Sequence, residues 1–244
     1  MNVYLITGAS SDIGCSFIQQ LEKKKEKCIV IAQYNTTNIR EKIGFDFEYV
    51  EMVPFKCDLS KEDQVDLLIE FLNENEYSIT HLIHLPAPKF SYMRLKDYDS
   101  SVVNNSVNTQ VNSLGKIFKS VLPKMKKQKY GKIVLMLTAY TIGTPPKFLT
   151  DYIISKYALL GLMKSAAVEY SGCGININAL SPNMIETKSL SNIDERIIEI
   201  TADQCAMKRN VKIDEVVSGI EYLLSDAASY IHGVNLNMTG GDAI

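Results

Sequence analysis

Short, almost wholly apolar runs alternate along the chain with longer segments in which apolar residues recur every three or four positions. The continuous runs predict strands covered on both faces, and the longer segments predict the helices that cover them. The predicted strands are residues 3–6, 28–32, 53–57, 82–85, 132–138, 175–180 and 234–238, and the main helices are 13–25, 61–75, 109–128, 152–171 and 213–224. This alternation predicts an α/β fold of three layers, a doubly wound and mostly parallel sheet between helices, with ligands at the carboxyl ends of the strands.

Composition and charge indicate the number of domains, the kinds of partner and the cellular location. No stretch rich in Pro, Gly or Ser divides the 244 residues, so we expect one domain over residues 1–244. A net charge of −2 gives no reason to expect nucleic acid or a membrane surface as a partner. The first apolar run begins at Val3 and none is long enough to span a bilayer, which predicts a cytoplasmic protein. Five scattered cysteines without a CxxC pair predict reduced thiols and no metal site.

The first predicted strand leads directly into the sequence TGASSDIG, and a predicted helix follows. Gly8 and Gly14 allow a sharp turn and a close approach of the backbone to a diphosphate, whose charge the helix N-terminus stabilises. We expect the amides of Ser11 and Ile13 to face that diphosphate and the side chain of Asp12 to face solvent. The segment therefore predicts a dinucleotide-binding domain of the Rossmann type.

The residues after the second predicted strand bear on which nicotinamide cofactor is preferred. A carboxylate there accepts from the ribose 2′-hydroxyl of NAD and repels the 2′-phosphate of NADP. No Asp or Glu occurs between Val30 and Arg40, whereas Asn35, Thr36 and Thr37 can hydrogen-bond a phosphate. The sequence therefore favours NADP(H) over NAD(H).

Tyr152 and Lys156 are four residues apart on a predicted helix and so lie on one face of it. A free tyrosine has a pKa near ~10, and a cation within ~4–6 Å lowers it. Such a tyrosine can exchange a proton with a carbonyl or alcohol oxygen while a hydride moves to or from a nicotinamide. Tyr92 and Lys96 repeat the spacing but follow no strand, so we interpret that copy as accidental.

These motifs resemble the short-chain dehydrogenase/reductase family, and the resemblance covers the whole chain. TGASSDIG corresponds to the family's TGxxxGxG, Tyr152 and Lys156 to its YxxxK, and PNMIET from Pro182 to its PGxxxT. The resemblance, in particular to 3-oxoacyl-ACP-reductase-like members, implies NADP(H)-dependent interconversion of a carbonyl and an alcohol on a small molecule. It implies that Tyr152 is the acid/base and that Lys156 lowers its pKa and binds the nicotinamide ribose. A homotetramer or homodimer is implied as well.

The motifs and the resemblance together imply a set of cofactor-binding residues along the carboxyl edge of the sheet. These are Gly8, Ser10, Ser11, Ile13, Gly14, Tyr34, Asn35, Thr36, Asp58, Leu59, Leu85, Pro86, Tyr152, Lys156, Pro182, Ile185 and Thr187.

Three positions depart from the family's pattern. Asp12 replaces a glycine of the first motif, and HLPA from His84 replaces NNAG. A histidine that ends an apolar strand is more often structural than catalytic. The family's serine, thirteen residues before the tyrosine, is Ala139 here. Thr138 should face the other side of its strand, which leaves Thr141 as a candidate hydroxyl.

A further family residue, an asparagine that holds a proton-relay water, has two possible counterparts. An ungapped count from Pro123 gives Gln110, whereas the N-x-x-G pattern gives Asn112 with Gly115. We favour Gln110 as a catalytic residue because a gap inside a helix would rotate its buried face.

Residues 186–206 are expected to form a lid over the substrate. The segment mixes charged and apolar side chains and so does not single out a sugar, a steroid, an acyl thioester or a small ketone; these side chains are Lys188, Leu190, Ile193, Arg196 and Ile197.

An alternative function is nucleotide binding with little or no catalysis, in regulation or assembly. Ala139, Asp12 and the altered NNAG favour it, while the intact Tyr152 and Lys156 argue for an enzyme.

Overall fold

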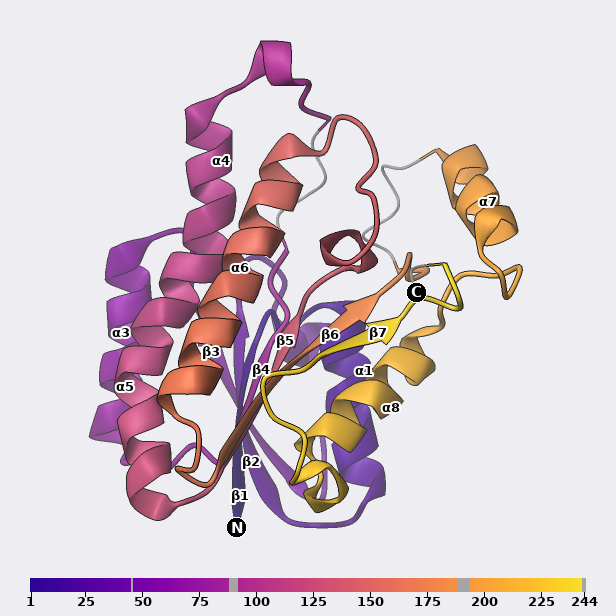
Figure 1. The fold of residues 1–244 in the computed structure, drawn as a ribbon. Helices are drawn as coiled ribbons and strands as arrows, with labels where there is room; N and C mark the ends of the chain where they lie inside the picture. The colour runs from indigo at the N-terminus through magenta and orange to yellow at the C-terminus, as the bar shows by residue number, and fades with distance from the viewer. Residues whose placement is uncertain (45, 88–91, 188–193, 243–244) are drawn as a thin grey trace.

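The computed structural model describes residues 1–44, 46–87, 92–187 and 194–242. Within them, seven parallel strands form one sheet in the order β3-β2-β1-β4-β5-β6-β7 (Figure 1). The strands are β1 (Asn2–Thr7), β2 (Cys28–Tyr34), β3 (Val50–Lys56), β4 (His81–His84), β5 (Gly131–Met136), β6 (Ile175–Pro182) and β7 (Asn235–Met238). The order reverses beside β1, so the crevice predicted for a doubly wound sheet lies at the carboxyl ends of β1 and β4.

Helices cover both faces of the sheet, which confirms the predicted three layers. Figure 1 shows α3, α5 and α6 on one face and α1 and α8 on the other. The α-helices are α1 (Asp12–Lys23), α2 (Ile39–Ile43), α3 (Glu62–Glu74), α4 (Ser100–Val107), α5 (Ser113–Gln128), α6 (Thr150–Glu169), α7 (Glu195–Gln204) and α8 (Ile213–Leu224). Shorter turns are η1 (Leu95–Asp97), the π-helical η2 (Asn108–Asn112), η3 (Ala139–Thr141) and η5 (Asp226–Ala228).

The sheet divides the apolar core into two clusters, one under each helical layer. Successive residues of β1 belong to different clusters: Leu5 packs with α3, α5 and α6, and Ile6 packs with α1 and α8. Both side chains are fully buried. Because each face of the strand meets a helix, the strand needs no polar face, and this explains the continuous apolar runs in the sequence.

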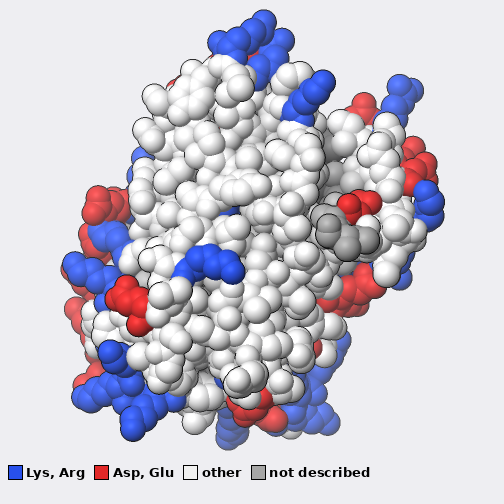
Figure 2. All heavy atoms as spheres, in the orientation of Figure 1, with Lys and Arg blue, Asp and Glu red and all other residues white. Residues whose placement is uncertain are grey.

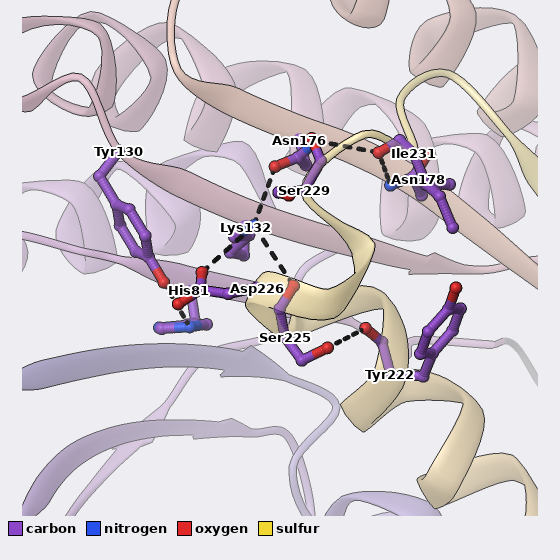
Figure 3. A network of polar contacts seen from close by, with 10 residues as sticks. All are labelled: His81, Tyr130, Lys132, Asn176, Asn178, Tyr222, Ser225, Asp226, Ser229 and Ile231. Atoms are coloured by element: carbon purple, nitrogen blue, oxygen red, sulfur yellow. Dashed lines mark hydrogen bonds and ion pairs between the residues drawn. The ribbon is translucent and has the colours of Figure 1, made fainter.

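Figure 3 shows a polar network that ties the amino-terminal ends of β5 and β6 to the segment between α8 and β7. The ammonium of the buried Lys132 donates to Asn176 Oδ1 at 3.0 Å and to the Ser225 carbonyl at 3.4 Å. Its Nζ also lies 3.7 Å from a carboxylate oxygen of Asp226. Asn178 donates to the Ile231 carbonyl at 2.9 Å. These contacts satisfy polar groups inside the fold and fix the entry to β7.

Replacing Asn178 tests this network. Its side chain is fully buried and also accepts from the Val234 amide at 3.0 Å. Asn178→Leu would leave the Ile231 carbonyl and the Val234 amide without these partners, so we expect the free energy of unfolding to fall by about 1–3 kcal/mol. Urea denaturation checks this, with Asn104→Leu on the exposed side of α4 as control. Equal denaturation midpoints for the two variants would contradict the structural role of Asn178.

The surface carries charges of both signs. In Figure 2, Lys and Arg mix with Asp and Glu along the margins of the drawn face, while its centre carries few charges.

Three large apolar side chains of α6, Ile154, Tyr157 and Val168, are exposed. The predicted homodimer or homotetramer stays a prediction. In the described ranges, no helix has the length and apolar character needed to cross a membrane.

Candidate active site

The turn between β1 and α1 requires its glycines. Gly8 has a φ of +71°, and a Cβ on it would lie 3.1 Å from the Pro86 nitrogen. A Cβ on Gly14 would lie 2.4 Å from the Ala9 carbonyl oxygen, which no side chain tolerates. The Gly8 amide donates to Gln33 Oε1 at 2.8 Å, which ties the turn to β2. The backbone therefore makes the close approach that a diphosphate-binding turn needs.

Two details of this turn differ from expectation. The Ser11 amide donates to the Gly8 carbonyl at 3.0 Å, and the Ser11 side chain caps α1 by accepting from the Gly14 amide at 3.1 Å. The Ser11 amide is thus used inside the turn and does not face a ligand. The amide of Ile13, in the first turn of α1, has no carbonyl partner within the helix and remains able to donate to a diphosphate.

The expectation for Asp12 was also wrong, because its carboxylate does not face open solvent. Asp12 lines a cleft together with Ser11 and Ile13, and its side chain is 15% exposed. Its Oδ1 lies 2.8 Å from Nζ of Lys42. A pairing between residues so far apart in sequence could not be expected from the local pattern.

Tyr152 and Lys156 line the same cleft as the turn. Both are on α6, the Tyr152 side chain is 8% exposed and Lys156 is 1% exposed. Lys156 Nζ is 5.7 Å from the centroid of the Tyr152 ring and donates to the Met136 carbonyl at 2.8 Å. The second YxxxK copy has no such arrangement, because Tyr92 precedes η1 and is 63% exposed.

Burial governs the protonation of this pair. It raises the pKa of Tyr152 to about 12. A hydrogen bond from the Thr138 hydroxyl acts in the opposite direction, because it stabilises the phenolate and so lowers this pKa. Burial lowers the pKa of Lys156 to about 7. In the protein alone, desolvation therefore outweighs the expected lowering of the Tyr152 pKa by Lys156.

Thr138 brings a hydroxyl next to Tyr152. It lines the cleft with Tyr152, contrary to the prediction that it faces away. The prediction took residue 138 as part of the strand, whereas β5 ends at Met136 and Thr138 lies between it and η3. Thr141 does not line the cleft: its hydroxyl donates to the Thr138 carbonyl at 2.8 Å and lies 3.3 Å from Ser181 Oγ.

Gln110 is buried in η2, but its side chain does not reach the cleft. Its Nε2 donates to Ser155 Oγ at 2.8 Å, and its carbonyl accepts from His84 Nε2 at 2.9 Å. The alternative counterpart, Asn112, is exposed and donates to Asn108 Oδ1. Ser155 thus engages the side-chain amide nitrogen, whereas Oε1 of Gln110 is buried without a hydrogen-bond partner among the described residues, and the role of Gln110 in holding a relay water stays a prediction.

His84 is a structural residue. Since a carbonyl only accepts, Nε2 carries the proton toward Gln110, and Nδ1 accepts from Thr7 Oγ1 at 2.7 Å. Burial lowers the pKa of His84 to about 3, so the imidazole is neutral near pH 7 and both nitrogens are engaged.

The remaining predicted cofactor residues divide into two groups. Leu85, Pro182, Ile185 and Thr187 line the cleft with the turn and Tyr152. Others lie at the carboxyl ends of β1 to β4 without lining it; these are Ser10, Tyr34, Asn35, Thr36, Asp58, Leu59 and Pro86.

Two of that second group have side chains with other structural roles. The carboxylate of Asp58 accepts from the Ser60 amide at 3.0 Å, and Leu59 is buried in the core. Asn35 and Thr36 are exposed after β2.

A larger cavity of about 570 Å³ adjoins the cleft and shares Tyr140, Asn183 and Met184 with it. Ile197 and Ile200 of α7 line the cavity, so part of the predicted lid lies beside it. Three residues of the predicted lid, Lys188, Leu190 and Ile193, lie outside the described residues, and Arg196 does not line the cavity. In the part of the chain that the structure describes, no group of His, Cys, Asp and Glu could hold a metal ion.

A family model described as enoyl-(acyl carrier protein) reductase matches residues 8–242. The chain belongs to the short-chain dehydrogenase/reductase family. This family member is 29% identical to 3-oxoacyl-(acyl-carrier-protein) reductase FabG of Buchnera aphidicola subsp. Acyrthosiphon pisum, over 97% of the chain and 95% of that relative. It is 28% identical to the reductase of the same name from Thermotoga maritima, over 98% and 96%.

Two solved structures share its fold. 4-Hydroxyisoleucine dehydrogenase complexed with NADH has a TM-score of 0.87 at 21% identity, covering 99% of this chain and 98% of that one. A variant of ElxO with NADPH bound has a TM-score of 0.85 at 24% identity, with the same coverage. One neighbour holds NADH and the other NADPH, so the fold alone leaves the cofactor preference open.

Proposed function

We propose that this protein catalyses the reversible, NADP(H)-dependent interconversion of a carbonyl and an alcohol on a small molecule. One observation carries the proposal: the buried pair Tyr152 and Lys156 lies in the same cleft as the N-terminus of α1. A helix N-terminus suited to a diphosphate and a tyrosine suited to acid/base chemistry in one cleft support this proposal, because a dinucleotide-dependent oxidoreductase needs both.

The residues of the cleft fit a nicotinamide cofactor. Gly8 and Gly14 leave the backbone of the turn without the Cβ atoms that would fill it, and the first amides of α1 are suited to a diphosphate. Pro182, Ile185 and Thr187 would hold the nicotinamide end near Tyr152. When bound, the cofactor supplies or accepts the hydride.

In the direction of reduction, Tyr152 donates its phenolic proton to the carbonyl oxygen of the substrate. With a pKa of about 12, Tyr152 is protonated at neutral pH and is in the form that this step requires. The Thr138 hydroxyl donates to the Tyr152 oxygen and so stabilises the phenolate that remains. Lys156, when charged, acts on the same phenolate and would contact the nicotinamide ribose.

The cavity of about 570 Å³ is the proposed substrate site. Leu149, Met184, Ile197 and Ile200 give it apolar walls, and Tyr140 lies where it meets the cleft. A substrate with an apolar body fits these walls. The non-catalytic alternative loses one of its supports, since Thr138 offers the hydroxyl that Ala139 does not.

The cofactor preference is tested by binding. We expect the protein to bind NADPH more tightly than NADH, and Asn35→Asp to reverse the order, with a change of about tenfold or more for NADPH. Asn35 is exposed after β2, so an added carboxylate there repels a 2′-phosphate. Isothermal calorimetry with both cofactors checks this, with Asn104→Asp on α4 as a control of equal charge. Tighter binding of NADH by the unmodified protein would refute the preference.

A further inference from the structure

An ion pair stands at the edge of the cleft where the turn meets α1. Asp12 is the first residue of α1, and Lys42 comes from α2, the short helix that follows β2. The Lys42 ammonium lies 2.8 Å from Asp12 Oδ1 and donates to the Ser10 carbonyl at 2.7 Å. The Lys42 side chain is 24% exposed and that of Asp12 is 15% exposed. The two contacts fix the position of the ammonium, and its partial exposure leaves it accessible to a ligand.

The carboxylate of Asp12 is unfavourable for cofactor binding by itself. It lines the cleft beside the helix N-terminus, where a diphosphate would bind, and two anions at one site repel each other. Lys42 compensates this charge. If Lys42 served only to neutralise Asp12, a neutral residue at position 12 would have the same effect without a lysine. The ion pair therefore suggests that the ammonium of Lys42 has a role of its own.

Lys42 has a donor to offer. An ammonium has three N–H groups, and two of them have acceptors, Ser10 and Asp12, among the described residues. Lys42 reaches the turn from the side of β2, where Asn35 and Thr36 are exposed and where the adenosine ribose of a dinucleotide binds. The neighbouring cation of α2, Arg40, is turned toward β3 and donates to the Met52 carbonyl at 3.0 Å.

We propose that Lys42, positioned by Asp12 and the Ser10 carbonyl, binds the 2′-phosphate of NADP(H) and determines the cofactor preference. This inference rests on the proposed function and assigns its specificity to one residue. Asp12 acts as a positioning residue: it orders a flexible side chain before the ligand arrives, which lowers the entropic cost of binding. An oxygen of the 2′-phosphate then accepts from the third N–H group of Lys42 in place of solvent.

Two small ligands separate the 2′-phosphate from the rest of the cofactor: adenosine 2′,5′-bisphosphate and 5′-AMP. We expect the unmodified protein to bind the bisphosphate more tightly. Lys42→Met should weaken the bisphosphate by about tenfold or more, the range for a lost hydrogen bond to a charged group, and 5′-AMP much less. Lys42→Arg should retain most of the preference, and Arg40→Met is the matched control that should leave it unchanged. Calorimetry gives all these affinities without turnover.

The double variant Asp12→Asn, Lys42→Met excludes a purely indirect effect. It lacks both charges, so no uncompensated carboxylate remains to repel phosphates. If it still lacks the preference for the bisphosphate, Lys42 itself contacts the 2′-phosphate. If the preference returns, Lys42 merely neutralises Asp12 and the inference is wrong. It is also wrong if Lys42→Met binds both ligands like the unmodified protein. Failure of the unmodified protein to bind either ligand would instead refute the proposed function.

Discussion

Replacing Tyr152 with Phe is expected to reduce carbonyl reduction by about 10²–10⁴-fold, the contribution of a positioned general acid. The ring and its packing in α6 are kept, and only the proton donor is lost. Affinity for NADPH should change little, because the hydroxyl serves the substrate oxygen. Steady-state rates of NADPH consumption and calorimetric binding measure the two effects separately.

The control for this variant is Tyr157→Phe, which lies on the same helix but is 46% exposed. It should leave both quantities unchanged. Turnover that survives in Tyr152→Phe would mean that another group donates the proton. His84 is a poor candidate, since it is buried, neutral and hydrogen-bonded at both nitrogens.

Lys156 gives this reaction a pH dependence with a defined sign. Burial lowers its pKa to about 7, so the protein alone loses this charge as the pH rises through that value. Since the charged form stabilises the Tyr152 phenolate, reduction should slow as the pH rises through the Lys156 pKa. An anionic ligand nearby moves that pKa upward. Lys156→Ala should lower both turnover and NADPH affinity and remove this limb of the pH profile.

The second large effect is expected at Thr138. Thr138→Val removes the hydroxyl that donates to Tyr152 and should lower turnover by about 10²–10³-fold, the usual effect of losing one preorganised donor. Thr138→Ser should keep most of the activity because it keeps the hydroxyl. The pH profile should also change, since the Tyr152 pKa rises further without this hydrogen bond.

Ala139→Ser distinguishes this account from one in which the site simply lacks a hydroxyl. Ala139 lines the proposed substrate cavity, whereas Thr138 lines the cleft and is hydrogen-bonded to Tyr152; since Thr138 already provides a hydroxyl to Tyr152, one added at residue 139 should bring little gain. NADPH consumption on one panel of diketones and quinones compares the variants. A faster Ala139→Ser protein together with an unaffected Thr138→Val protein would contradict the role of Thr138.

Much of the fold was predictable because each strand is buried on both faces. The continuous apolar runs of β1, β2 and β6 can be read without knowing their partners. α4 was missed: its sequence SSVVNNSV is rich in residues that hydrogen-bond their own backbone and favour other conformations. It is helical because it packs on α6, a tertiary contact that the local sequence does not encode.

The site was predictable where it rests on spacing along one element. The two glycines of the turn and the pair on α6 are local patterns, and the structure brings both to one cleft, whereas the contacts of Ser11 and Asp12 within the turn differ from expectation. Thr138 was missed because its direction depends on where β5 ends, which a sequence indicates only to within a few residues. Lys42 was missed because its partner lies on another helix.

The central claim is that this cleft transfers hydride between a nicotinamide and a carbonyl carbon. The most direct measurement is incubation with NADPH deuterated at the transferring carbon and a panel of apolar ketones and diketones, followed by mass spectrometry of the alcohol products. The account predicts one deuterium on the carbinol carbon with the unmodified protein and almost none with Tyr152→Phe. Tight binding of NADPH without deuterium in any product would contradict it and favour nucleotide binding without catalysis.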